Sequence, residues 1–180
     1  MTTSGELYKL PETKRLFFRQ HIAEDMDAYC AMEMDADVRR YVGGRPRTRE
    51  QAEQRFLGAL APVTDNLHMW ATIYKPEDKY IGRCGIYPHF GDDNQPIPDE
   101  ASLGLYIARD YWGRGLAKEA GEAFVEFGFK TLDINRIVTA IQMGNDTSVR
   151  VIEKLGFKLK WTEEGALRSY YHYELRKGGF

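Results

Sequence analysis

Cysteine and histidine are scarce in this sequence, and they form no recognisable metal-binding pattern. Only Cys30 and Cys84 occur in 180 residues, which is too few for a disulfide framework. No CxxC, HxxxH or HExxH spacing is present among them, and such spacings are typical of zinc sites. We therefore expect neither structural disulfides nor a bound metal.

Long hydrophobic runs and an excess of charge of one sign are also missing. The sequence shows no N-terminal apolar run typical of a signal peptide and no apolar stretch long enough to span a bilayer. Its formal net charge is -2, so no overall basic field attracts nucleic acid. We expect a cytoplasmic protein without a nucleic-acid or membrane partner, and the sequence leaves a homodimer open.

The chain does contain regularly spaced strand-like and helix-like segments, in an ordinary globular composition. Strands are predicted at residues 15–20, 68–74, 80–87, 101–108, 136–142, 158–162 and 168–176. Helices are predicted at residues 24–34, 48–60 and 114–132, and a short helix ends at Gly156. Residues 88–100, "PHFGDDNQPIPDE", are predicted to form a polar loop.

These segments follow one another in the order β-α-α-β-β-β-α-β-α-β-β, which is not a strict βαβ alternation. A mixed α/β (α+β) fold is therefore predicted, with a mostly antiparallel central sheet of about seven strands flanked by about four helices. The length suits one domain over residues 1–180.

The most informative segment is "LGLYIARDYWGRGLAKEAG", residues 103–121, where Gly113-Arg114-Gly115 joins a predicted strand to a predicted helix. The glycines allow a tight turn and a close approach by a ligand. A helix N-terminus offers free N–H groups and a positive partial charge, so Arg114 and Lys118 are unfavourable there without an anion such as phosphate. The alternative is a plain connection with solvated cations.

Two common phosphate motifs do not fit this segment. The dinucleotide fingerprint GxGxxG or GxGxxA needs a small residue where Lys118 stands, and it belongs early in a βαβ unit. The P-loop pattern GxxxxGK[ST] is absent. A different phosphate-bearing ligand is therefore indicated.

Three segments, in matching order, resemble one known family. "YWGRGLAKEA" at residues 111–120 and "GNDTSVRVIEKLGF" at residues 144–157 resemble the acetyl-CoA-binding region of the Gcn5-related N-acetyltransferases (GNAT). "ETKRLFFRQHIAEDMDAYCAMEMDADVRRYVGG" at residues 12–44 resembles the start of the ribosomal-protein alanine N-acetyltransferases within that family. The resemblance covers residues 12–158, and it implies the GNAT fold with acetyl-CoA as cosubstrate.

The resemblance also implies which residues contact acetyl-CoA. Backbone N–H groups of the turn would hold the pyrophosphate, and the end of the preceding strand would pair with the pantetheine arm. The implied residues are Trp112, Gly113, Arg114, Gly115, Leu116 and Ala117 for the pyrophosphate, and Leu105, Tyr106 and Ile107 for the pantetheine. Asn145 would contact CoA as well, although Asn145 or Thr147 can equally be an N-cap. Asp110 stands where the family usually has Gln or Arg.

Acetyl transfer from a thioester to an amine needs a neutral amine, a polarised carbonyl and a proton for the thiolate. The resemblance implies Ser148 as the proton donor, because Ile152 replaces the family's usual tyrosine. The subgroup often has Glu where Ser102 stands. We expect Glu100, two residues earlier on the same strand face, to act as the base or to position a water. The alternative for Glu100 is an exposed carboxylate without a role.

Other residues are weaker candidates for the acceptor side. Glu163 and Glu164 are further possible bases that the sequence does not rank. The acidic residues of the predicted loop 88–100 either attract a cationic amine or are merely solvated. Tyr87 and Phe90 bracket this loop, and one of them is expected to line the substrate cleft.

The predicted function is acetyl-CoA-dependent N-acetylation of a primary amine, either a protein N-terminal α-amine or a small-molecule amine. The amine is expected to attack the thioester directly in a ternary complex, because Cys30 and Cys84 lie outside the cofactor motifs. A catalytically silent CoA-binding sensor or scaffold is the alternative. A nicotinamide-dependent oxidoreductase is a third and weaker interpretation.

Overall fold

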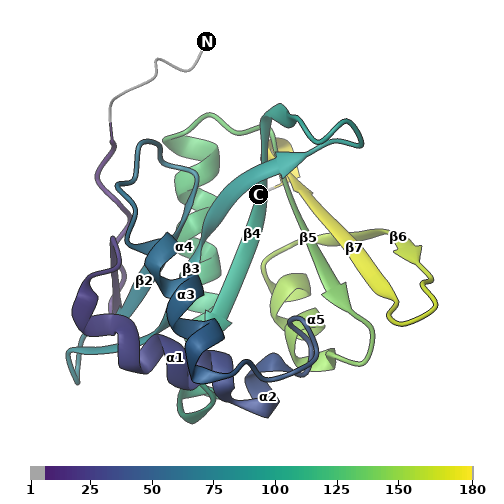
Figure 1. Ribbon diagram of the computed structural model, residues 1–180. Helices are drawn as coiled ribbons and strands as arrows, with labels where there is room; N and C mark the ends of the chain where they lie inside the picture. Colours follow the sequence, from purple (N-terminus) through teal and green to yellow (C-terminus); the bar gives the residue numbers. More distant parts are fainter. Residues whose placement is uncertain (1–6, 180) are drawn as a thin grey trace.

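Seven strands form one sheet in the computed structural model, which describes residues 7–179 (Figure 1). The strands are β1 (Leu16–Arg19), β2 (His68–Tyr74), β3 (Lys79–Phe90), β4 (Pro96–Ile107), β5 (Arg136–Gln142), β6 (Lys158–Glu163) and β7 (Tyr170–Arg176). The α-helices are α1 (Met26–Met34), α2 (Ala36–Arg39), α3 (Arg49–Ala59), α4 (Leu116–Lys130) and α5 (Asp146–Lys154). The predicted order of elements is confirmed, with α2 added.

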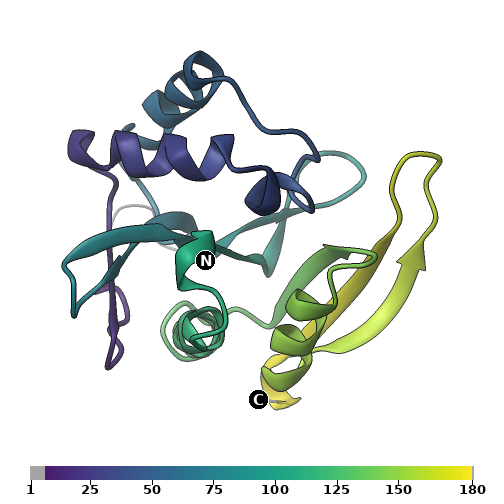
Figure 2. The same ribbon diagram turned by 90° about the horizontal axis from the view of Figure 1, so that it is seen from below.

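The sheet has the strand order β1-β2-β3-β4-β5-β7-β6, and its neighbours are antiparallel except for the parallel pair β4 and β5. Figure 2 shows α1–α3 on one side of the sheet and α4 and α5 on the other. The predicted mixed, mostly antiparallel sheet is therefore confirmed. A fifth helix, α2, is present because the Asp35 side chain accepts the N–H groups of Asp37 and Val38 and so starts a separate short helix.

The main core lies between the sheet and the α4–α5 side. One side of α4 is apolar and buried in this core, since Leu116, Ala120, Phe124 and Phe127 are each at most 5% exposed. A smaller cluster, built around Tyr29, Cys30, Ala52 and Phe56, lies between α1 and α3. The two faces of the sheet are thus covered differently, because the large apolar side chains of α4 fill only one of them.

The hairpin of β3 and β4 is longer than the sequence predicts. A polar loop is expected over residues 88–100, but Phe90 pairs with Pro96 and only residues 91–95 form the turn. Prolines are tolerated in this end of β4 because pairing with β5 begins only at Glu100. Before that point, a proline nitrogen is not required to donate to a second neighbouring strand.

Strands β4 and β5 are paired over a short distance and then part. Their register comprises the pairs Glu100–Arg136, Ala101–Ile137 and Ser102–Val138. Beyond Ser102, β4 continues to Ile107 without further pairing to β5. Figures 1 and 2 show the two parts of the sheet diverging from this point. The facing backbone edges are therefore left to find other hydrogen-bond partners.

His21 is buried in the smaller cluster, and it lacks hydrogen-bond partners there. Its side chain is packed against Tyr29, Phe56 and Tyr80, with ring centroids 5.8 to 6.0 Å apart. Within residues 7–179, no partner is found for either ring nitrogen. Burial lowers the pKa of His21 from 6.5 to about 4, so the imidazole is neutral at pH 7.

Acidification is expected to destabilise the protein through His21. The unfolded chain takes up this proton near its ordinary pKa of 6.5, whereas the folded protein does so only at about 4. The contribution of the neutral His21 to stability is therefore fully present above pH 6.5, and it is lost as the pH falls from 6.5 toward 4. This group alone should lower the free energy of unfolding by about 2 kcal/mol between pH 8 and pH 5.

Urea unfolding of the wild type and of a His21→Phe variant at both pH values measures this contribution. The variant should lose about 2 kcal/mol less stability than the wild type on acidification. The same pH dependence in both proteins would show that His21 is not the responsible group.

Candidate functional site

The turn before α4 presents a row of unpaired N–H groups. Gly113 and Gly115 have φ values of 72° and 76°, a left-handed conformation that favours glycine. No protein acceptor among the described residues is bonded to the N–H groups of residues 113–118, whereas Glu119 N–H donates to Gly115 O at 3.1 Å. These N–H groups lie at the positive end of a helix dipole, so the turn is suited to a pyrophosphate.

The residues expected to bind pyrophosphate lie together in this turn, but Trp112 has no N–H group free for a ligand. Its backbone N–H donates to Arg109 O at 3.0 Å, and its indole N–H donates to Ile107 O at 2.7 Å. Both donors of Trp112 are therefore used inside the protein. The free series begins at Gly113 and extends one residue beyond Ala117.

The basic side chains at this turn have carboxylate partners of their own. Arg114 lies 3.9 Å from Glu77, and Lys118 pairs with Glu122 one helical turn later. The sequence argument that Arg114 and Lys118 require an external anion is therefore weaker than expected. The argument for a bound phosphate rests on the backbone N–H groups instead.

The edge of β4 offers backbone groups on the side that β5 has left. Successive strand residues direct their N–H and C=O groups to opposite sides. Ala108 N–H donates to Ile81 O of β3 at 2.7 Å, so Leu105 and Ile107 direct theirs away from β3. Tyr106 presents its backbone to β3. The C=O of Ile107 already accepts the Trp112 indole N–H. Of the three expected pantetheine residues, Leu105 thus has both an N–H and a C=O directed into the gap.

Four polar side chains meet on one sheet face where β4 and β5 part. His89 Nδ1 lies 3.3 Å from Ser102 Oγ, and His89 Nε2 lies 4.0 Å from Glu100 Oε2. Glu100 is also paired with Arg136, with an N–O distance of 2.5 Å. Burial lowers the pKa of His89, although Glu100 opposes this effect. At pH 7 the cluster therefore holds a neutral imidazole beside a carboxylate.

Sequence reasoning misses His89 because it assigns residues 88–100 to a loop. The longer β3–β4 pairing makes Tyr87 the cross-strand partner of Ser102 and places His89 on the same face, two residues further. Burial raises the pKa of Tyr87, which stays protonated. Phe90 is 49% exposed at the end of β3. The period-two spacing of Tyr87 and His89 is the signal that could have identified the strand.

Asn145 and Ser148 lie at the start of α5. Asn145 is the N-cap, because its Oδ1 accepts the N–H of Ser148 at 3.3 Å. Its amide nitrogen and the Ser148 hydroxyl have no hydrogen-bond partner within the described part of the chain. Since β4 and β5 are parallel, α4 and α5 both begin at the same edge of the sheet. Ile152, which the sequence resemblance aligns with a tyrosine, is an apolar side chain that is 4% exposed.

Glu33 of α1 is the centre of a buried ion cluster that no sequence motif indicates. Its carboxylate is bound by Arg83 at 2.6 Å, Arg47 at 2.7 Å and Arg39 at 3.2 Å. The Arg83 guanidinium also lies over the ring of Tyr106, 4.9 Å from its centroid. These residues come from three separate parts of the chain, so only the tertiary structure brings them together.

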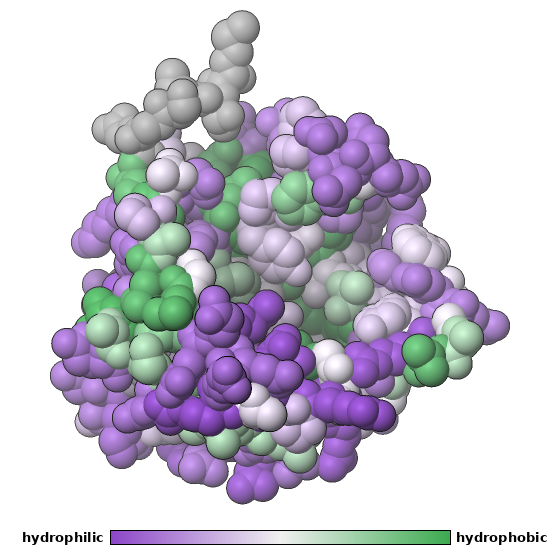
Figure 3. All heavy atoms as spheres, viewed as in Figure 1, coloured by the Kyte–Doolittle hydropathy of each residue, from purple (hydrophilic) through white to green (hydrophobic). Residues whose placement is uncertain are grey.

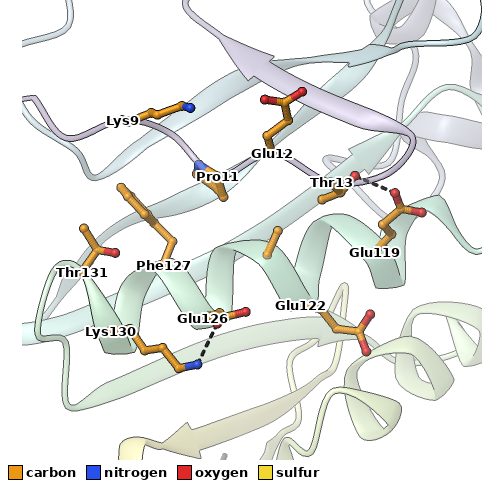
Figure 4. A pocket seen from close by; sticks show the side chains of 11 residues that line it. Lys9, Pro11, Glu12, Thr13, Glu119, Glu122, Glu126, Phe127, Lys130 and Thr131 are labelled. Atoms are coloured by element: carbon orange, nitrogen blue, oxygen red, sulfur yellow. Dashed lines mark hydrogen bonds and ion pairs between the residues drawn. The ribbon is translucent and has the colours of Figure 1, made fainter.

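Figure 3 shows a hollow in the molecular surface between α1–α3 and the β6–β7 hairpin, with strongly hydrophilic residues along its lower edge. Another pocket lies between residues 9–13 and α4 (Figure 4). The carboxylates of that pocket are already engaged, Glu126 with Lys130 and Glu119 with Thr13. We therefore place the candidate site at the parting of β4 and β5.

Within residues 7–179, no group of three or more His, Cys, Asp or Glu side chains is arranged to hold a metal ion. The helices of this range are too short or too polar to cross a membrane.

Comparison with known proteins identifies similar sequences. A family model described as "Acetyltransferase (GNAT) domain" matches residues 15–158. The uncharacterized N-acetyltransferase YnaD of Bacillus subtilis is 31% identical over 146 residues, which cover 81% of each chain. The uncharacterized N-acetyltransferase p20 of Bacillus licheniformis is 28% identical over 160 residues, which cover 88% of this chain and 85% of p20.

Solved structures share the fold. A GNAT-family acetyltransferase from Bacillus anthracis matches with a TM-score of 0.80 at 22% identity, over 94% of this chain and 99% of that one. A spermidine N-acetyltransferase from Vibrio cholerae, solved with CoA and spermine, matches with a TM-score of 0.74 at 15% identity. That match covers 93% of this chain and 98% of the other. These likenesses concern the fold, which is the one that the sequence resemblance implies.

Proposed function

The chain belongs to the GNAT family of acetyltransferases, and from this premise we propose that it acetylates a primary amine, using acetyl-CoA as the donor. The acceptor is the α-amine of a protein N-terminus or the amine of a small molecule. The amine attacks the thioester directly while both substrates are bound. As the sequence leads us to expect, the reaction is assigned to the cytoplasm.

The observation that carries this proposal is the continuity between the free edge of β4 and the turn before α4. A pyrophosphate that accepts from the N–H groups of residues 113–118 can extend an amide-containing arm along β4. Leu105 would supply the N–H and C=O for that arm. Its thioester would then lie near Ser102, where the strands part. CoA has its pyrophosphate, amides and thiol in this order.

The reaction requires a neutral amine nitrogen. An α-amine titrates near 7.7–8.0 and is partly neutral at physiological pH, whereas a lysine-type amine titrates near 10.4. The nitrogen attacks the carbonyl carbon, the C–N bond forms, and the C–S bond breaks. The proton from the amine goes to a base, and the departing thiolate takes a proton from an acid. An α-amine therefore makes the smaller demand on a base.

His89 is the best-placed base, and Glu100 acts through it as a positioning residue. The imidazole is neutral at pH 7 because burial lowers its pKa, so it can accept a proton. Glu100, 4.0 Å from Nε2, would stabilise the imidazolium that forms, while Arg136 fixes the carboxylate. This assignment keeps the sequence-based expectation for Glu100 but gives the proton transfer to His89.

Ser148 is the proposed proton donor to the thiolate. Its hydroxyl lies in the first turn of α5, beside the gap that the CoA arm would enter, and it has no hydrogen-bond partner among the described residues. Asn145 caps that turn and would hold CoA through its free amide nitrogen.

The proposed function predicts that acetyl-CoA and CoA raise the melting temperature and that NADH does not. Free CoA thiol should then appear when acetyl-CoA is mixed with a primary amine, as measured with a thiol reagent against a panel of peptides and small amines. Absence of stabilisation by CoA species would contradict the binding site. Stabilisation without thiol release for any amine would support the silent CoA-binding alternative.

The pH dependence of turnover should separate the two proposed proton-transfer groups. In His89→Gln, kcat at pH 7 should fall by about 10²-fold and should recover in part above the pKa of the acceptor amine, where no base is needed. In Ser148→Ala the loss should persist at high pH, because the thiolate still lacks its donor. His68→Gln, on the opposite face of the sheet, is the control and should behave as wild type. Unchanged kcat across pH in His89→Gln or Ser148→Ala would remove that residue from the mechanism.

A further inference from the structure

The segment between α2 and α3, residues 40–48, lies across the end of the gap between the two parts of the sheet. A Cβ placed on Gly144, just after β5, would lie 3.8 Å from Cε1 of Tyr41. Arg168, in the connection between β6 and β7, donates to Gly43 O at 2.9 Å. The α2–α3 segment therefore contacts the β5–β7 part of the sheet, and Figure 2 shows it extending from α2 toward that part.

The other end of this segment joins the ion cluster around Glu33. Arg47 N–H donates to Glu33 O at 2.9 Å, and its guanidinium binds the Glu33 carboxylate. That single carboxylate faces Arg39, Arg47 and Arg83. Three guanidinium groups and one carboxylate leave two positive charges in excess, in a place where Glu33 and Arg39 are 3% and 7% exposed.

The neighbouring acidic groups do not balance this excess, since Glu50, which lines the same pocket as Arg47, is matched there by Arg55. Asp35 and Asp37 are paired with Arg109, at 3.6 and 3.0 Å. Within residues 7–179, Arg45 and Arg168 have no carboxylate within 4.0 Å. Burial and the nearby Arg47 and Arg83 guanidinium groups lower the pKa of Arg39, against the effect of Glu33. The local balance of charge is therefore positive.

This positive region lies beside the path that the CoA arm would follow along β4. The Arg83 guanidinium lies over Tyr106, and Tyr106 belongs to the part of β4 that has separated from β5. Arg47 is the most accessible of the three arginines, with 29% of its side chain exposed. An extended acceptor that enters from the α1–α3 side would therefore contact these guanidinium groups while its amine reaches the thioester, four strand residues away near Ser102.

We infer that the acceptor amine carries a carboxylate, which Arg47 and its neighbouring guanidinium groups bind. The inference rests on the proposed acetyl transfer and specifies its substrate class. A planar guanidinium pairs with a carboxylate through two parallel hydrogen bonds, and such pairs are strong where water is largely excluded. A polyamine would add positive charge to a region where guanidinium groups already outnumber carboxylates. The carboxylate belongs to a free amino acid or to an acidic side chain near a peptide N-terminus.

The test compares acceptors that differ only in charge, with CoA thiol release as the measurement. One pair is a tripeptide amide with Asp-Glu after its first residue and the same peptide with Asn-Gln. A second pair is glutamate and its diamide counterpart, which distinguishes a free amino acid from a peptide. Spermidine is the cationic comparison. At least one acidic acceptor should have a kcat/KM about tenfold or more above its neutral partner, and this preference should shrink at high salt.

Variants of Arg47 connect that preference to the cluster. Arg47→Gln should abolish most of the preference by raising KM for the acidic acceptor, while kcat/KM for the neutral partner changes little. Arg47→Lys should restore part of it. Arg49→Gln makes the same change of charge at a residue that pairs with Asp27 and Glu53 on α3, and it should keep the full preference. A second variant, Arg168→Gln, removes a neighbouring guanidinium group that donates to Gly43 O and leaves the ion pairs of Glu33 unchanged; it should also reduce the preference.

The outcomes distinguish this inference from the function on which it rests. Equal turnover of acidic and neutral acceptors, or a preference for spermidine, would overturn the carboxylate-bearing acceptor and leave acetyl transfer intact. A preference for acidic acceptors that survives both Arg47→Gln and Arg168→Gln would overturn the assigned binding residues. Thiol release with none of the acceptors would contradict the proposed function as well.

Discussion

The parting of β4 from β5 after Ser102 is the constraint on which the rest of this structure depends. A strand that loses its neighbour leaves N–H and C=O groups that must find other partners. Side chains satisfy part of this need, since Thr139 Oγ1 donates to Leu103 O at 3.2 Å and the Trp112 indole donates to Ile107 O at 2.7 Å. Leu105 lies between these two positions, and its groups stay available to a ligand.

The two faces of the sheet carry different kinds of side chain around this gap. On one face the apolar side chains of α4 fix the helix whose N-terminus carries the unpaired N–H groups. The other face carries polar side chains, with His89 and Glu100 where the strands part and the arginines around Glu33 further along β3 and β4. The acyl donor is thus assigned to the gap, and the acceptor to the polar face.

Local sequence signals predicted elements whose ends are set by nearby residues. The capping box of Thr48 and Gln51 starts α3 where the sequence predicts a helix, and the glycines of the turn mark the start of α4. The length of the β3–β4 hairpin was not predictable, because prolines are excluded only where a strand must donate to two neighbours. The cluster around Glu33 was also not predicted. Its arginines are 6, 14 and 50 residues away from Glu33 in the sequence, and sequence motifs describe only residues at short, regular spacings.

Hydrogen–deuterium exchange with and without acetyl-CoA tests the central claim most directly, because the claim concerns particular backbone N–H groups. The account predicts that acetyl-CoA slows exchange at residues 113–118 and at Leu105, and that exchange in β2, residues 68–74, is unchanged. Acetyl-CoA binding without slower exchange at the turn before α4 and at Leu105 would contradict it.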